Sequence, residues 1–124
     1  MVSKEVTSSF APLSFEQFWS WLQSHPNCIL RAGTIDSIVY DHEDHHWRFH
    51  LGEDGTACAQ MIRGKRLIAE VLIDPKEVAF VGRSMNEREE FLFDLHDNGQ
   101  RVLFYFAMTH DFDAEDEPAP TQWN

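Results

Sequence analysis

Apolar positions in the first part of the chain follow helical spacing. The side chains that share this spacing are Phe15, Phe18, Trp19 and Leu22. Ser14 suits the N-cap position of such a helix, and Gln17 completes a capping box three residues later. Pro26 disfavours the α conformation at His25, so the helix is expected to end before it. Trp21 lies off the main apolar stripe, and we expect it at the edge of that face.

Beyond this helix the period of the apolar positions changes to two, which is typical of strands. The expected strands cover residues 28–40, 46–51, 56–62, 66–73, 77–82, 90–96 and 101–108. Gly33 is expected to bend the first of them. The last two are joined by Asp97–Gln100, where Asn98 and Gly99 suit positive φ angles. The final strand is apolar on both faces, which predicts either a central strand or a strand in a dimer interface.

These elements predict an α+β fold, with an N-terminal helix packed on a mostly antiparallel sheet of about six to seven strands. Hydrophobic residues make up 43% of the 124 residues, which is enough to fill one core. We expect a single domain over residues 1–110. The acidic, proline-containing stretch 111–124 is expected to be a disordered tail.

The formal net charge of −11 narrows the classes of partner. Nucleic acids and anionic membranes both require lysine and arginine, so we expect neither, whereas a basic protein remains a suitable partner. No apolar run reaches transmembrane length, and no signal peptide is evident. Cys28 and Cys58 do not form a disulfide framework and are interpreted as small buried hydrophobes in strands. A reducing, cytoplasmic location is therefore expected.

The densest set of titratable groups is the histidine-rich stretch 41–50. His46 and His50 fall on one face of the expected strand, and imidazoles bind zinc, copper, nickel and iron. Four residues along a strand separate the two rings too far for easy chelation of one ion. A single axial haem ligand needs no such spacing, so His46 and His50 are candidate metal ligands in that sense. A solvated turn that runs into an edge strand is the alternative.

Arg63, Lys65 and Arg66 form the one basic cluster of the sequence. Guanidinium groups offer paired donors to a carboxylate or a phosphate, and a solvated β-turn is the alternative. The serines lack the setting of a nucleophile elbow, and no pair of carboxylates suited to acid–base chemistry is identifiable. We therefore assign no catalytic residue from the sequence.

The second half of the chain resembles the haem-utilisation carrier proteins of the HemS/ChuX/HutX type. The resemblance spans about residues 32–110, and the segments that carry it best are 77–85, 90–94, 98–99 and 102–106. It implies a homodimer with packed sheets and a haem group held by a histidine, with basic groups near the propionates. His46 and His50 lie where the ligand would map, and Arg83 lies in the better-matched segment.

In this interpretation Arg63, Arg66 and Arg83 are the candidate cofactor-binding cations. Residues 59–61 depart from the family, which tends to have a Gly-His pair in that region. Two other functions stay open. The acidic charge suits a protein-binding adaptor or chaperone without a cofactor. The order of helix and strands resembles a flavin-binding split-barrel enzyme in outline.

Overall fold

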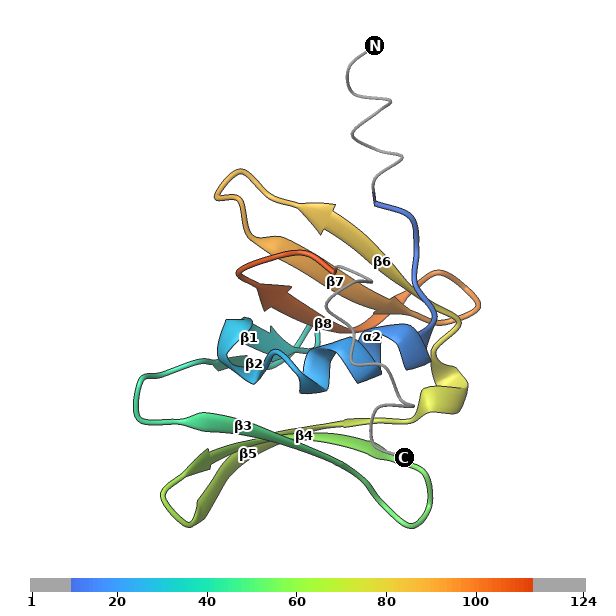
Figure 1. The fold of residues 1–124 in the computed structure, drawn as a ribbon. Helices are drawn as coiled ribbons and strands as arrows, with labels where there is room; N and C mark the ends of the chain where they lie inside the picture. The colour runs from blue at the N-terminus through green and yellow to red at the C-terminus, as the bar shows by residue number, and fades with distance from the viewer. Residues whose placement is uncertain (1–9, 113–124) are drawn as a thin grey trace, which may run out of the picture.

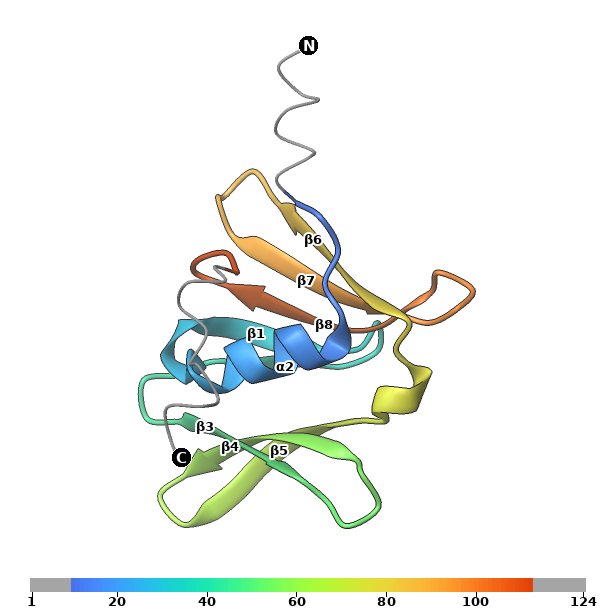
Figure 2. The ribbon, with the colours of Figure 1, turned by 45° about the vertical axis from the view of Figure 1, so that its right-hand side comes forward.

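The computed structural model describes residues 10–112, which form one α-helix between two antiparallel sheets (Figures 1 and 2). The helix is α2 (Phe15–Gln23), followed by the short 3-10 helix η1 (Pro26–Cys28), and a second 3-10 helix η2 covers Pro75–Glu77. The strands are β1 (Ile29–Gly33), β2 (Ile38–Tyr40), β3 (His46–Leu51), β4 (Ala57–Arg63), β5 (Arg66–Ile73), β6 (Phe80–Met85), β7 (Phe91–His96) and β8 (Val102–Met108). No helix within this part of the chain is both long and apolar enough to span a bilayer.

The α+β class is confirmed, but the strands form two sheets where one was expected, and there is one more strand than expected. The described residues contain eight strands in two sheets, ordered β2-β1-β8-β7-β6 and β3-β4-β5. The additional strand arises because residues 28–40 form a hairpin and not one bent strand. The chain reverses after Gly33, where a Cβ atom would collide with the carbonyl oxygen of Ser37. Glycine is therefore needed at this close approach of two backbones.

The start of helix α2 follows from local sequence and agrees with the expectation. The Gln17 amide donates to the Ser14 hydroxyl at 3.0 Å, and the Ser14 amide donates to the Gln17 side chain at 2.9 Å. Two amides at the N-terminus of the helix are thereby satisfied. At the other end Ser24 is the C-cap, and η1 takes over at Pro26.

The helix is the shared core element of both sheets. Phe18 packs on the five-stranded sheet, with ring centroids 5.2 Å from Phe93 and 5.4 Å from Phe106. Trp19 packs on the three-stranded sheet, edge to face with Phe49 at 5.6 Å. Because both sides of the helix are covered, its apolar surface is wider than the stripe of a one-sided amphipathic helix.

The position expected for Trp21, at the edge of the apolar face, is wrong because both sides of the helix are covered. The side chain is fully buried and not at the edge of the apolar face, and its ring lies 5.2 Å from that of Phe93. Helical periodicity locates one apolar face. It does not show that a second packing partner also buries a residue beside that face.

Two further differences concern turns. The strand expected over residues 77–82 begins later. Glu77 belongs to η2, which Asp74 caps by accepting the Lys76 amide at 3.0 Å, and β6 covers Phe80–Met85. In the turn between β7 and β8, the residue with positive φ is Gln100, at 67°, and not Asn98 or Gly99. The Gln100 amide bonds the Asp97 carbonyl at 3.0 Å, so the left-handed residue falls one position later than an Asn-Gly hairpin predicts.

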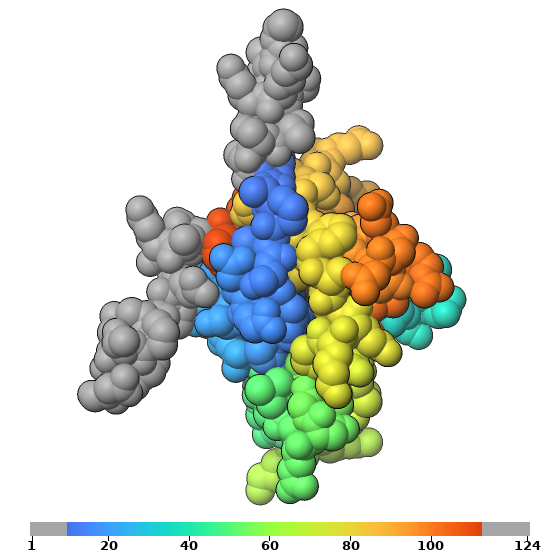
Figure 3. All heavy atoms as spheres, turned by 90° about the vertical axis from the view of Figure 1, so that its right-hand side faces the viewer, coloured from blue at the N-terminus to red at the C-terminus, as the bar shows by residue number. Residues whose placement is uncertain are grey.

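β8 occupies the centre of the five-stranded sheet, as one of the two expectations for it required. At the β6 edge, the N-terminal segment runs alongside (blue beside yellow in Figure 3). There Leu13 and Val81 exchange two backbone hydrogen bonds of 2.9 and 2.8 Å. The edge strand is thereby partly covered.

The expected acidic tail lies outside the described residues except for its first two positions. Asp111 and Phe112 pack against the domain, so the ordered unit extends past residue 110. Residues 113–124 are not described by the structure.

Candidate binding face

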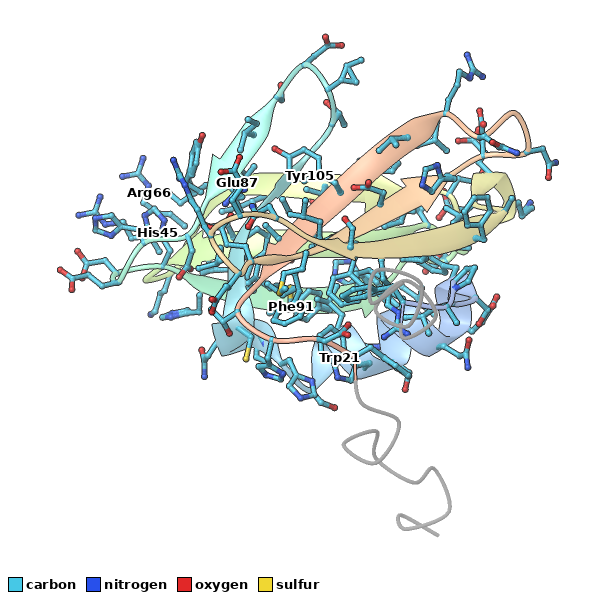
Figure 4. All side chains as sticks on the ribbon, turned by 90° about the horizontal axis from the view of Figure 1, so that it is seen from above. Trp21, His45, Arg66, Glu87, Phe91 and Tyr105 are labelled. Carbon is cyan, nitrogen blue, oxygen red and sulfur yellow. The ribbon has the colours of Figure 1, made fainter. Side chains whose placement is uncertain are left out.

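Among residues 10–112, the five-stranded sheet is packed on one face and uncovered on the other. Phe93 and Phe106 point towards α2, and the alternate residues of each strand therefore point to the opposite side. Figure 4 shows Trp21 and Tyr105 on opposite sides of this sheet. The side chains on the uncovered side, which we call the open face, include Arg31, Ile38, Tyr40, Phe80, Leu92, Asp94, His96, Leu103 and Tyr105.

Asp94 is the central carboxylate of the open face. Its register partners are Tyr105 on β8 and Gly82 on β6, so it lies between a ring and a position without a side chain. Next to it the rings of Phe80 and His96 are stacked, with centroids 4.6 Å apart. Asp94 is half-buried among these groups, in a niche lined mainly by aromatic side chains.

The electrostatics of this niche follow from its burial. Removal of water raises the pKa of the Asp94 carboxyl above its usual range, and the charge of the nearby His96 acts in the opposite direction. Within residues 10–112 the Asp94 side chain makes no hydrogen bond or ion pair. Because water still reaches part of the carboxylate, its incomplete hydration carries a modest cost, and a cationic ligand would relieve that cost.

An apolar groove of about 670 Å³ adjoins this niche. It is lined by Ile35, Arg101, Val102, Leu103 and Tyr105. Tyr105 belongs to both features, because it lines the groove and faces Asp94 across the strand pair. The open face therefore offers an anionic position beside an apolar one, an arrangement suited to an amphipathic ligand.

The chemistry of this arrangement suits the binding of a cation. A carboxylate forms charge-assisted hydrogen bonds with lysine or arginine, and neighbouring aromatic faces attract the same cations. No group of three or more histidine, cysteine or acidic side chains that could hold a metal ion occurs in the described range.

The predicted ligands His46 and His50 lie elsewhere, on edge strand β3. Both are exposed, and their register partners are Ile62 and Cys58. They occupy the side of the three-stranded sheet opposite Trp47, whose side chain is buried against the core. Haem binding through them stays a prediction, and haemin titration of His46→Ala and His50→Ala variants tests it.

The predicted cations are divided between the two sheets. Arg63 and Arg66 face each other across the β4–β5 hairpin, at the same end as His45 (Figure 4). His46 pairs with the neighbour of Arg63, so the structure brings His46, Arg63 and Arg66 to one end of the three-stranded sheet.

Arg83 belongs to the other sheet, and its side chain is only 9% exposed. It forms an ion pair with Asp111 at 3.1 Å and donates to the Ala11 carbonyl at 2.9 Å. The structure therefore does not bring Arg83 together with the other predicted cations, and these bonds give it a place in the packing of the domain.

Sequence reasoning did not single out Asp94 as a site residue. The available signal was indirect, because the outward side of β8 carries Leu103, Tyr105 and Ala107, and only the fold shows that no element of residues 10–112 covers it. Asp94 becomes notable once its register with Tyr105 is known.

No protein-family model, curated protein or solved structure matches this chain.

Proposed function

We propose that this protein is a binding module without catalytic activity, and that it holds a basic segment of another protein on the open face. The observation that carries the proposal is the Asp94 carboxylate, which is half-buried, aromatic-lined and without a partner among residues 10–112. A lysine or arginine side chain placed there would form an ion pair and contact Tyr105 or Phe80.

Charge complementarity favours a basic partner over a second copy of the chain. The formal net charge is −11, and two like-charged copies repel each other when their faces meet. The turns at the ends of the open-face strands carry the acidic Asp36, Asp41, Glu87 and Glu89, and the basic Arg88 offsets one of these charges. Glu87 lies on the same side of the sheet as Tyr105 in Figure 4.

The adjoining groove supports an extended, amphipathic segment. Side chains alternate along an extended peptide, so one residue can reach Asp94 while a neighbour two positions away enters the groove beside Leu103 and Val102. The exposed Ile35, which is 82% accessible, would be covered by such a segment.

The test is a titration of isotope-labelled protein, followed by NMR, with a peptide that alternates lysine and valine. We expect saturable shifts at residues 92–96 and 103–105, which weaken as salt is added because the attraction is partly electrostatic. Asp94→Asn should reduce the affinity by about tenfold, the range of a charge-assisted hydrogen bond.

Matched controls separate this site from general attraction to an acidic protein. Glu53→Gln removes one negative charge from the β3–β4 turn of the other sheet, and its affinity should equal that of the wild type. A peptide with glutamate in place of lysine should cause no shifts. Shifts spread over all acidic loops, or an affinity that Asp94→Asn leaves unchanged, would overturn the proposal.

A further inference from the structure

The two cysteines of the chain lie in contrasting surroundings. Cys28 is the last residue of η1 and not part of a strand, and it is only partly buried. Its sulfur lies 3.0 Å from Nε2 of His110, which is 82 positions away in sequence. The backbone fixes this approach, because the Thr109 amide donates to the Cys28 carbonyl at 2.8 Å.

The neighbours of His110 fix the orientation of its ring and the nitrogen that carries the proton. The centroid of the ring lies 5.8 Å from that of Trp21 and 5.0 Å from that of His25, in T-shaped contacts. Nδ1 of His110 lies 3.4 Å from the Asp111 carbonyl oxygen, which can only accept. With the proton on Nδ1, Nε2 is left as an acceptor for the thiol proton of Cys28.

Neighbouring His25 does not compete for this role. Its Nδ1 lies 2.8 Å from the Trp21 carbonyl oxygen, and its ring stacks on that of Trp21 with centroids 4.6 Å apart. The rings of Trp21 and His25 and the backbone hydrogen bond from Thr109 to Cys28 therefore hold Cys28 and His110 together.

Cys58 provides an internal comparison. It is 8% exposed in the middle of the three-stranded sheet, where His50 is its register partner on β3, and within the described residues its sulfur forms no hydrogen bond with a histidine. Burial, with smaller effects of Glu70 and Asp54, raises the pKa of the Cys58 thiol. Buried thiols in such surroundings are inert.

We infer that Cys28 and His110 form a nucleophilic thiol site, at which small disulfides modify the protein. The thiol proton passes to Nε2 of His110, and the sulfur attacks one sulfur of the disulfide. The S–S bond of the reagent breaks as the new S–S bond forms. Cys28 is thereby oxidised to a mixed disulfide, and the released thiolate is the reduced product, which takes the proton from His110.

The first test keeps His110 and compares the reaction rate of Cys28 in the folded and the unfolded protein. The Cys58→Ser variant is treated with the neutral disulfide dithiodipyridine, once in buffer and once in guanidinium, and the released thiopyridone is followed by absorbance. A free cysteine peptide corrects for the solvent. An activated thiol reacts faster in the folded state, and we expect at least about a tenfold higher rate. A folded rate equal to or below the unfolded rate would overturn the inference.

The second test assigns the role to His110. In the Cys58→Ser background, His110→Gln should lower the rate at Cys28 about three- to tenfold, whereas His42→Gln, in the distant turn before β3, should not change it. An unchanged or raised rate in a folded His110→Gln variant would show that the histidine only shields the thiol.

If His110→Gln lowers the rate only by loosening the fold, a separate measurement at Cys58 shows it. If His110→Gln loosened the fold, Cys58 in the otherwise unaltered protein would react faster than before. Circular dichroism melts monitor the same change. The inference stands only if the rate at Cys28 falls while that at Cys58 stays constant, and any other combination contradicts it.

Discussion

Nη1 of Arg83 lies 3.1 Å from the carboxylate of Asp111, so an ion pair joins β6 to the segment that follows β8. The same guanidinium donates to the Ala11 carbonyl and lies 5.7 Å from the centre of the Phe112 ring. One side chain therefore holds the N-terminal and C-terminal approaches to the domain against the same strand.

Arg83→Gln should destabilise the protein by about 2 kcal/mol, because it leaves Asp111 without its cation and removes a largely buried guanidinium. Urea denaturation followed by circular dichroism measures the change. Arg101→Gln is the matched control, since Arg101 is 82% exposed in its pair with Asp97 and should matter little. Equal losses for the two variants would mean that the burial of Arg83 contributes nothing.

Asp94→Asn should stabilise the protein at neutral pH by less than about 1 kcal/mol, because the carboxyl is only partly removed from water. Its pKa is raised in the folded state, so the folded protein binds the proton more tightly than the unfolded chain does. Stability is therefore lost as pH rises through the raised pKa, and the penalty is absent below the ordinary value of 3.8.

Urea melts of both proteins between about pH 7 and pH 3.5 measure this difference. The advantage of the variant should shrink as the pH falls. A variant that is less stable than the wild type at neutral pH would indicate that Asp94 has a stabilising partner.

Trp21→Ala should cost about 3–5 kcal/mol, because the ring fills the space between the helix and Phe93. Trp21→Phe should cost clearly less, about 1–2 kcal/mol. It keeps an aromatic contact and removes an indole N–H that is buried without a hydrogen-bond partner in residues 10–112. Thermal melts compare the two, and similar losses would argue that the N–H is bonded.

Ser14→Ala should lower the stability by about 1 kcal/mol through loss of the helix cap. Ser20→Ala, in the middle of the same helix, provides the matched control and should be neutral or slightly stabilising, since alanine is the better helix former. The expectation fails if both substitutions have the same effect in urea melts.

The parts of the fold that depend on neighbours in sequence were predictable. The Ser14 and Gln17 capping box and the limits of β3 and β5 follow from patterns of a few residues. Trp21 was not placed correctly, because its burial depends on a sheet built from residues far along the chain. Local pattern describes which face of an element is apolar, and not how many partners cover it.

The candidate sites show the same limit more strongly. The exposed histidines of β3 were predicted as ligands because they cluster in sequence. Asp94 is recognised as a candidate only from its register with Tyr105. Likewise Cys28 and His110 meet only when β1 and β8 pair. Sites formed by distant segments carry no spacing signal in a single sequence.

The two hydrogen bonds between Leu13 and Val81 have a practical consequence for shortened forms of the protein. A fragment that begins at residue 14 would keep the whole of α2, yet its β6 would present unsatisfied amides and carbonyls to solution. Such a strand is a template for other chains, so we expect the fragment to aggregate more readily than the intact protein. The segment just before the helix would then limit the growth of the sheet at this edge.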